Sequence, residues 1–222
     1  MPLAYRHRLS DSAEVGVWRG TETHAELLDA LPEQWTRRLP SHPDRARETL
    51  SARNALCTLL PGAVLHGFEK DEYGKPRLSG APDLHFSLTH SAMAGAALVA
   101  AQPCGIDLQR RVDKITRLRS KFERADERAC VSAHADEVGA LHVLWGAKES
   151  LFKLWGARHI DWHEHLVVHA FDATAASGTF TGEVRKHGRV IGARLAYVWL
   201  DDSCLVTAIR DDGASASAAE RH

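Results

Sequence analysis

The chain has 222 residues, of which 44% are hydrophobic and 26% are charged, and its formal net charge is −1. A nearly neutral chain has no global field to attract nucleic acid or a membrane surface. No apolar run approaches the roughly 20 residues that are needed to cross a bilayer. We therefore expect one compact unit or two small halves, with neither nucleic acid nor membrane as a partner.

The cysteines are widely separated, and no CxxC pair suggests a zinc ribbon. The first residues contain no hydrophobic signal core. Reduced thiols and a cytoplasmic location are the simplest expectation, and the chain length suits a monomer.

The first hundred residues combine helical and strand patterns. Their periodicity predicts, in chain order, a strand over 15–18, helices over 22–31 and 43–60, a turn over 73–76, and strands over 84–87 and 94–101. Residues 89–91 are expected in a loop between the last two strands.

The remaining residues predict a second group of elements. These are a strand over 105–109, short helical pieces within 110–133, a helix over 136–155, and strands over 166–171, 179–186, 189–200 and 204–209. A break at 102–104 divides the chain into predicted domains 1–102 and 103–210, followed by a disordered tail over 211–222. The predicted fold class is α+β, with two small halves.

The segment 145–153 reads Trp-Gly-Ala-Lys-Glu-Ser-Leu-Phe-Lys and lies in the long predicted helix. Trp145, Glu149 and Lys153 are four residues apart and share one face, with Lys148 on the adjoining ridge. A carboxylate between two ammonium groups fits a site where a divalent metal meets phosphate. On its own, Glu149 with Lys153 is also an ordinary stabilising helix pair.

The segment 105–109 reads Gly-Ile-Asp-Leu-Gln, and Asp107 and Gln109 project from one face of the predicted strand. Carboxylate and amide oxygens are hard ligands of the kind that Mg²⁺ prefers. Two polar residues facing solvent would explain the strand pattern alone. The combination with Glu149 favours a site for Mg²⁺, and Mn²⁺ fits the same oxygen ligands.

Two further segments carry polar side chains at turns and strand ends. Residues 86–91 read Phe-Ser-Leu-Thr-His-Ser, and their hydroxyl and imidazole groups can bind phosphate oxygens. A catalytic pair of Ser91 with His90 is the alternative, but adjacent residues rarely reach that geometry and no G-x-S-x-G elbow occurs. Residues 73–77, Tyr-Gly-Lys-Pro-Arg, are by themselves a turn with exposed cations.

Taken in chain order, from 73–77 to 145–153, the four segments resemble the motifs of the 4′-phosphopantetheinyl transferases of the surfactin-synthetase-activating type. That family shows a GKP turn, an F-S/N-x-S/T-H-S segment, G-[IV]-D-x-E and W-x-x-K-E-[AS]-x-x-K. An upstream Ala-Arg-Asn-Ala-Leu at 52–56 resembles the family's Ala-Arg-x-x-Leu segment. The resemblance implies two similar α+β halves packed as a pseudo-dimer, with the active site in the cleft between them.

The resemblance also implies an activity, namely Mg²⁺-dependent transfer of the 4′-phosphopantetheine group of coenzyme A to a serine of an acyl or peptidyl carrier protein. Adenosine 3′,5′-bisphosphate is the expected second product. The alternative is a module that binds coenzyme A or a carrier protein without catalysis.

The family resemblance assigns roles to residues of this chain. It implies that Asp107, Glu149 and Lys153 are catalytic, with Asp107 and Glu149 holding the metal and Glu149 accepting the serine proton directly or through water. Gln109 stands where the family commonly has Glu, so it would bind the metal directly or through water and would bring no charge to the site. The implied contacts with coenzyme A are Arg38, Arg53, Lys75, Pro76, Thr89, His90, Lys148 and Lys153.

Residues 110–124 are locally basic. Seven Lys and Arg residues against Asp113 and Glu123 give an excess of five positive charges. Because the family's carrier proteins are usually acidic, this segment is expected to dock the partner; a solvated surface is the equal alternative. A zinc site at His159 and His163 is a further alternative, although no HExxH motif occurs.

Overall fold

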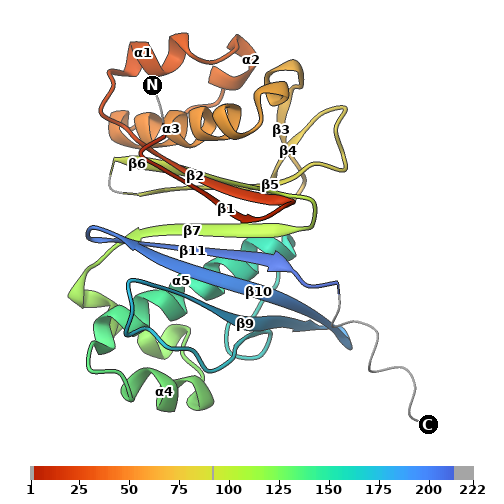
Figure 1. The fold of residues 1–222 in the computed structure, drawn as a ribbon. Coiled ribbons are helices and arrows are strands. Elements are labelled where there is room, and N and C mark those ends of the chain that lie inside the picture. The colour runs from red at the N-terminus through yellow and green to blue at the C-terminus, as the bar shows by residue number, and fades with distance from the viewer. Residues whose placement is uncertain (1–2, 92, 213–222) are drawn as a thin grey trace.

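The chain forms two β-sheets stacked between helices, as a computed structural model shows for residues 3–91 and 93–212 (Figure 1). The first sheet has the strand order β1-β2-β6-β5 and the second has the order β7-β11-β10-β9-β8. This is a mixed α/β architecture, as predicted. The expected division at 102/103 falls between β6 and β7, and the expected tail over 211–222 lies almost wholly outside the described residues.

The first sheet and its helices come from the first hundred residues. Their bounds are β1 (Tyr5–Ser10), β2 (Ala13–Arg19), α1 (His24–Asp29), α2 (Glu33–Thr36), α3 (Pro43–Leu59), the 3-10 helix η1 (Pro61–Leu65), β3 (Phe68–Lys70), β4 (Pro76–Leu78), β5 (His85–Ser91) and β6 (Ala94–Ala100). Strands β3 and β4 form a separate two-stranded hairpin beside the sheet.

The second sheet and its helices follow from Cys104. Their bounds are β7 (Cys104–Arg110), η2 (Asp113–Arg117), η3 (Arg119–Lys121), α4 (Ala125–Ser132), α5 (Glu137–Trp155), β8 (Leu166–Val168), β9 (Ser177–Lys186), β10 (Arg189–Leu200) and β11 (Ser203–Arg210). Helix α5 begins where the Asp136 carboxylate accepts the backbone N–H of Gly139, and it ends at Gly156, whose φ of 74° is left-handed.

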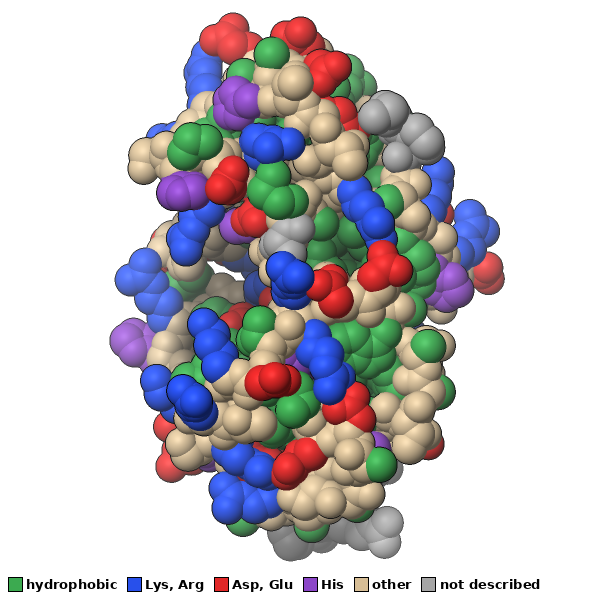
Figure 2. Space-filling model, turned by 90° about the vertical axis from the view of Figure 1, so that its left-hand side faces the viewer, with side chains coloured by type: hydrophobic (Ala, Val, Ile, Leu, Met, Phe, Trp, Pro, Cys, Tyr) green, Lys and Arg blue, Asp and Glu red, His purple; other side chains and the backbone are tan. Residues whose placement is uncertain are grey.

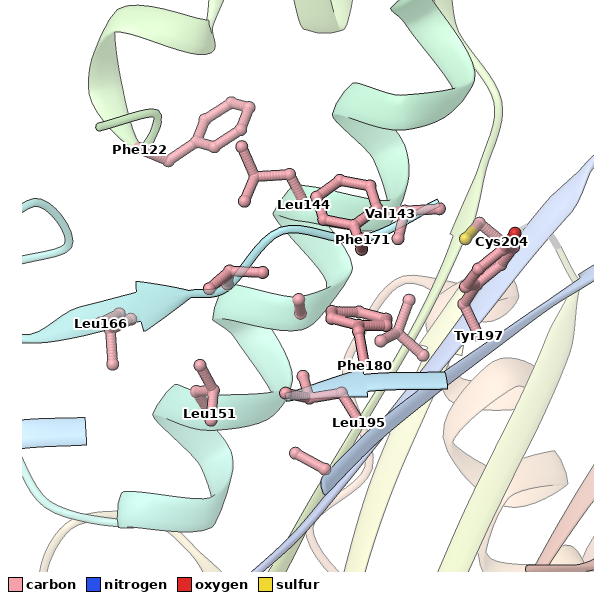
Figure 3. Packing of buried hydrophobic residues seen from close by; sticks show 14 of the residues in the cluster. Phe122, Val143, Leu144, Leu151, Leu166, Phe171, Phe180, Leu195, Tyr197 and Cys204 are labelled. Atoms are coloured by element: carbon pink, nitrogen blue, oxygen red, sulfur yellow. The ribbon is translucent and has the colours of Figure 1, made fainter. Parts of the chain in front are cut away.

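Apolar side chains fill three clusters. Leu144 and Leu151 of α5 pack with Phe180 of β9 and Leu195 of β10 beneath the second sheet (Figure 3). A second cluster lies between the two sheets, and a third lies under α3. Full burial of each leucine stabilises the fold by about 2 kcal/mol, so these clusters fix how the helices and sheets lie on one another.

Two glycines allow a helix backbone to touch a strand. A Cβ atom at Gly95 of β6 would lie 2.0 Å from the backbone N of Ala52 in α3, and one at Gly105 of β7 would lie 1.9 Å from the carbonyl O of Ser150 in α5. Any side chain at either position would push the helix away from the strand. The contact at Gly105 brings α5 close to Asp107, two residues along β7.

Most predicted elements are confirmed, and the differences have local causes. The residues predicted as a loop at 89–91 continue β5, because His90 and Ser91 pair with Gly95 and Ala94 of β6. Strand β8 ends at Val168 and not at 171. Sequence periodicity did not predict β1, α2 or the β3–β4 hairpin, which are short and have mostly exposed side chains.

Across the described ranges, no helix has the length and apolar character needed to cross a membrane.

Candidate active site

A pocket of about 390 Å³ opens between the two halves of the chain. Its walls come from α3, the β3–β4 hairpin, β5 and the C-terminal end of α5. The titratable side chains among its described lining residues, Tyr73 apart, are all basic: Arg38, Arg53, Lys70, Lys75, His90, Lys153 and Arg158. Figure 2 shows Lys and Arg side chains around a hollow between the two halves. A cleft lined by charge of one sign attracts a polyanion such as a diphosphate.

A larger cavity of about 740 Å³ lies between β1 and the strands β9 and β10. Its lining residues are mostly apolar or hydroxyl-bearing, and they include none of the predicted site residues. We place the candidate site in the smaller, basic pocket because its side chains match the chemistry that the motifs predict.

The structure brings Asp107, Glu149 and Lys153 together where β7 crosses α5. Lys153 donates to the carbonyl O of Ile106 at 2.7 Å, and its Nζ lies 3.1 Å from Asp107 Oδ1. Burial raises the pKa of Asp107, while Lys153, the Thr89 hydroxyl and the Leu108 N–H oppose that rise. Lys153 lines the pocket, whereas its carboxylate partner Asp107 is nearly buried and is not among the lining residues.

Glu149 lies one turn before Lys153 on α5. Its carboxylate makes no hydrogen bond or ion pair within residues 3–91 and 93–212. Burial raises the pKa of Glu149, the negative charge of Asp107 raises it further, and Lys153 lowers it. The two carboxylates are thus close enough to repel each other, and a shared cation would relieve that repulsion.

This donor set fits a magnesium ion. Mg²⁺ takes oxygen ligands and commonly binds proteins through one or two carboxylates, with water and substrate phosphates completing its shell. Within the described residues, no group of three or more His, Cys, Asp or Glu side chains could hold a metal. Any ion held by Asp107 and Glu149 therefore depends on water and on the ligand for its other contacts.

Gln109 is directed away from that pair. Its Nε2 donates to the carbonyl O of His142 at 3.0 Å, and its Oε1 accepts from His142 Nδ1 at 2.9 Å. The backbone N–H of Val112 donates to His142 Nε2 at 3.0 Å, which gives the imidazole a defined tautomer. The amide oxygen is therefore already used, and we remove Gln109 from the set of metal ligands.

Thr89 has a different position from the predicted one. It is 6% exposed, does not line the pocket, and accepts the backbone N–H of Leu108 at 3.2 Å. Ser87 accepts the N–H of Ile106 in the same way, so hydroxyl groups of β5 bind the edge of β7. Thr89 also hydrogen-bonds the Asp107 carboxylate. It therefore positions Asp107 and does not face a bound nucleotide.

Lys148 is the clearest correction to the sequence prediction. Its side chain has no exposed surface, its Nζ lies 2.8 Å from Glu127 Oε2, and it donates to the carbonyl groups of Trp162 and Leu166. Burial lowers the pKa of Lys148, and Glu127 opposes that change. This ammonium connects α5 to α4 and the segment before β8, so it is not available to a phosphate.

Arg53 is also mostly structural. It is 4% exposed, its Nη1 donates to the carbonyl groups of Trp35 and Arg37, and its guanidinium lies 4.8 Å from the ring centroid of Phe68. Arg53 Nε is buried without a partner in the described chain, although the residue lines the pocket. Arg38, with φ of 55°, is exposed on the pocket wall, so it is the better candidate for a phosphate contact.

Lys75 and Pro76, which the family resemblance implies as contacts of coenzyme A, line the pocket at the β3–β4 turn. The Asp71 carboxylate shapes this turn by accepting the N–H groups of Tyr73 and Lys75, both at 2.9 Å. Lys75 Nζ donates to the carbonyl O of Leu154 at 3.3 Å, at the end of α5. Lys75 therefore reaches across the gap between the halves.

Three residues at the site were not predicted from the sequence. Lys70 and Arg158 line the pocket, and Glu48 lies 3.1 Å from His90. None of them belongs to a recognised motif. Lys70 lies shortly before the predicted turn over 73–76, and Arg158 follows the predicted helix over 136–155, so position gave only a weak signal for these two. The predicted helix over 43–60 gave no signal for Glu48.

The predicted basic segment is partly neutralised within the fold. Arg110, Arg111, Arg119 and Arg124 form ion pairs with acidic residues of the chain. Lys114, Arg117 and Lys121 are exposed, and no ion pair involves them in the described part of the chain.

Comparison with known proteins connects this geometry to a family. Residues 103–194 match the family described as the 4′-phosphopantetheinyl transferase superfamily. The matched segment lies in the second half of the chain and is similar to that superfamily. The family prediction from the motifs is therefore confirmed.

Similar proteins include a 4′-phosphopantetheinyl transferase from Bacillus subtilis, which is 34% identical over 103 residues. The 4′-phosphopantetheinyl transferase Sfp of Bacillus subtilis (strain 168) is 32% identical over 93 residues, and the transferase gsp of Aneurinibacillus migulanus is 31% identical over 91. In the same order, these matches cover 44%, 40% and 40% of this chain. They cover 44%, 41% and 38% of the relatives, so the chain spans less than half the length of the curated relatives it matches.

The match to the superfamily includes Asp107, Glu149 and Lys153. It does not reach Arg38, Lys75 or His90 in the first half. The contribution of those residues to the pocket is known from the structure alone.

Proposed function

We propose that the chain is a 4′-phosphopantetheinyl transferase that uses coenzyme A to modify a serine of a carrier protein. One observation carries this proposal: Asp107, Glu149 and Lys153 lie together at the edge of a pocket lined by basic side chains. The similar proteins are 4′-phosphopantetheinyl transferases, which supports the same activity.

In the proposed reaction, the serine Oγ attacks the β-phosphorus of coenzyme A. A new O–P bond forms, the bond from that phosphorus to the bridging oxygen breaks, and adenosine 3′,5′-bisphosphate leaves. Such a transfer needs positioning and stabilisation of charge more than covalent catalysis. Arg38, Lys75 and Arg158 would bind the phosphates and the nucleotide end in the pocket, with Pro76 beside them.

Asp107 and Glu149 would hold Mg²⁺, which supplies Lewis-acid stabilisation of the diphosphate when bound. Lys153 would neutralise a phosphate oxygen as negative charge develops. Glu149, whose pKa is raised by burial, would accept the serine proton directly or through water. Thr89 would hold Asp107 in place during the reaction.

The test is the mass of an apo carrier protein after incubation with the chain, coenzyme A and Mg²⁺. We expect a gain of one phosphopantetheine group and no gain after chelation of divalent ions. Binding of coenzyme A without that gain would instead identify a non-catalytic binding module.

We also propose that the two halves are related as a pseudo-dimer. Two observations support this. In the first half, β2 pairs with β6, and β6 pairs with β5. In the second half, β7 pairs with β11, and β11 pairs with β10, which is the same pattern. A glycine contact also joins strand and helix in each half.

For the carrier protein, we propose docking on the exposed cations Lys114, Arg117 and Lys121. Charge complementarity with an acidic partner raises the association rate and is weakened by salt. Reversing all three to Glu should raise the KM for the carrier about tenfold at low salt. The matched control reverses Arg45, Arg189 and Arg194, which are exposed elsewhere; an equal rise in that control would remove the docking assignment.

We also propose that the protein acts as a monomer in the cytoplasm. The four cysteines of the described chain are unpaired, which is compatible with a reducing compartment.

A further inference from the structure

Glu48 of α3 contacts both His90 and the backbone that follows it. Glu48 Oε2 lies 3.1 Å from His90 Nδ1, and Oε1 accepts the backbone N–H of Met93 at 3.0 Å. The side chain of His90 is 41% exposed and that of Glu48 is 15% exposed. His90 lines the basic pocket and Glu48 does not. The imidazole therefore borders the pocket, and the carboxylate that contacts it does not.

This contact determines which ring nitrogen is available to a ligand. An ionised carboxylate only accepts hydrogen bonds, so Nδ1 carries the hydrogen in this pair. Within residues 3–91 and 93–212, His90 Nε2 makes no hydrogen bond or ion pair. When one nitrogen is held in this way, the ring orientation and the role of the other nitrogen are set as well.

Glu48 also restricts the imidazole before a ligand arrives. It connects α3 to the end of β5 and to the residue that begins the return towards β6. A side chain that is already ordered loses less conformational entropy on binding than a free one. His90 is exposed enough to rotate without this partner, so the effect of Glu48 on binding should exceed its effect on folding.

We propose that Glu48 is a positioning residue, which holds His90 so that Nε2 contacts a phosphate group of coenzyme A. The inference rests on the proposed function, because it names the residue that orients His90, a contact with coenzyme A that the family resemblance implies. Glu48 itself touches neither coenzyme A nor the reacting atoms.

The test is a cycle of variants, with coenzyme A binding measured by titration calorimetry and turnover measured in the carrier assay. Glu48→Ala should raise the Kd and the KM for coenzyme A about tenfold while kcat changes less than about twofold. His90→Ala should have the same effect, and the double variant should be no worse than either single variant, because both changes remove one contact.

Glu48→Gln keeps the shape and one accepting oxygen, so its Kd should lie between those of the wild type and Glu48→Ala. Asp44→Asn is the matched control, because it removes one carboxylate from α3 a turn earlier without touching His90. If Glu48→Ala does not fold at the assay temperature, the test is the comparison of the Kd for coenzyme A between Glu48→Gln and Asp44→Asn.

Two results would overturn the inference: an unchanged Kd in the Glu48 variants, or fully additive losses in the double variant. If the wild type transfers phosphopantetheine and the Glu48 variants behave like it, only the positioning role is lost. If the wild type does not bind coenzyme A, the proposed function and the positioning role are both wrong.

Discussion

The two halves of the molecule share a strand arrangement but bring different chemistry to the pocket between them. The first half contributes cations from a loop, a hairpin and a strand end, including Arg38, Lys75 and His90. The second half contributes Lys153 to the pocket lining, and the carboxylates Asp107 and Glu149 lie near that lysine. The shared scaffold positions the pocket walls, and the residue types placed on those walls determine the chemistry.

The same contrast occurs along β7 and α5 within the second half. At one end, the charge of Asp107 raises the pKa of Glu149, and the ammonium of Lys153 acts on both carboxylates. At the other end, Gln109 and His142 satisfy each other by two hydrogen bonds. One end of this contact is therefore electrostatically strained and suited to a ligand, while the other end is a closed structural contact.

The largest expected effect comes from the carboxylate pair. Asp107→Asn or Glu149→Gln should lower kcat for phosphopantetheine transfer by at least about a thousandfold, because the metal and the diphosphate lose their charged partner. The melting temperature should not fall, since a raised pKa shows that each buried charge is costly to the fold.

Asp201→Asn is the control for that change, because this carboxylate is exposed in the turn between β10 and β11 and pairs with Arg19. Its activity should match that of the wild type. Full activity in Asp107→Asn would remove the metal assignment.

The two lysines of α5 should respond in opposite ways. Lys148→Met leaves Glu127 buried without its ion pair, which should destabilise the fold by about 3–5 kcal/mol. Lys153→Met should cost less stability but lower kcat about a hundredfold. Urea unfolding and carrier modification by the folded fraction measure the two effects.

The double variant Lys148→Met/Glu127→Gln should recover part of the stability that Lys148→Met loses, because a neutral amide can be buried without an ammonium partner. If Lys148→Met instead kept its stability and lost kcat, the buried pair would not be the role of this residue.

A smaller effect is expected at Gln109, the position where the sequence departs from the family motif. Because the amide of Gln109 is uncharged, the sequence predicts that a glutamate at this position would strengthen metal binding. In the structure the amide binds His142, so Gln109→Glu should leave the Mg²⁺ requirement unchanged and cost about 1 kcal/mol through the lost bond to the His142 carbonyl. A clear fall in the Mg²⁺ concentration for half-maximal rate would show that position 109 reaches the metal.

The smallest expected effect is the pH dependence of folding that arises from His142. Burial lowers the pKa of His142, so the unfolded chain binds a proton more readily than the folded chain. The stabilising contribution of the neutral imidazole is complete above the unfolded pKa, near 6.5, and is lost as pH falls below it. The free energy of unfolding should therefore fall more between pH 7 and pH 5.5 in the wild type than in His142→Gln.

How much the sequence predicted differs between regular elements and their ends, for a physical reason. Asp107, Glu149 and Lys153 lie on one regular strand and one regular helix, so the spacing of the residues in each element indicates which side chains share a face. The pocket cations Lys70 and Arg158 lie at or beyond the ends of regular elements, where spacing carries no such information.

Lys148 shows the other limit of sequence reasoning. It is on the same helix as Glu149, and its charge suggested a phosphate contact. The structure pairs it instead with Glu127 from α4, which is 21 positions earlier in the chain. Tertiary packing decides which face of a helix is buried, and a motif alone does not show where a long side chain ends.

The central claim is that Asp107 and Glu149 share one divalent ion beside a bound diphosphate. The most direct test is Mn²⁺ binding, measured by electron paramagnetic resonance with coenzyme A present, in the wild type and in the Asp107→Asn/Glu149→Gln double variant. We expect one bound ion per wild-type chain and no bound ion in the double variant. Equal binding by both proteins would contradict the account.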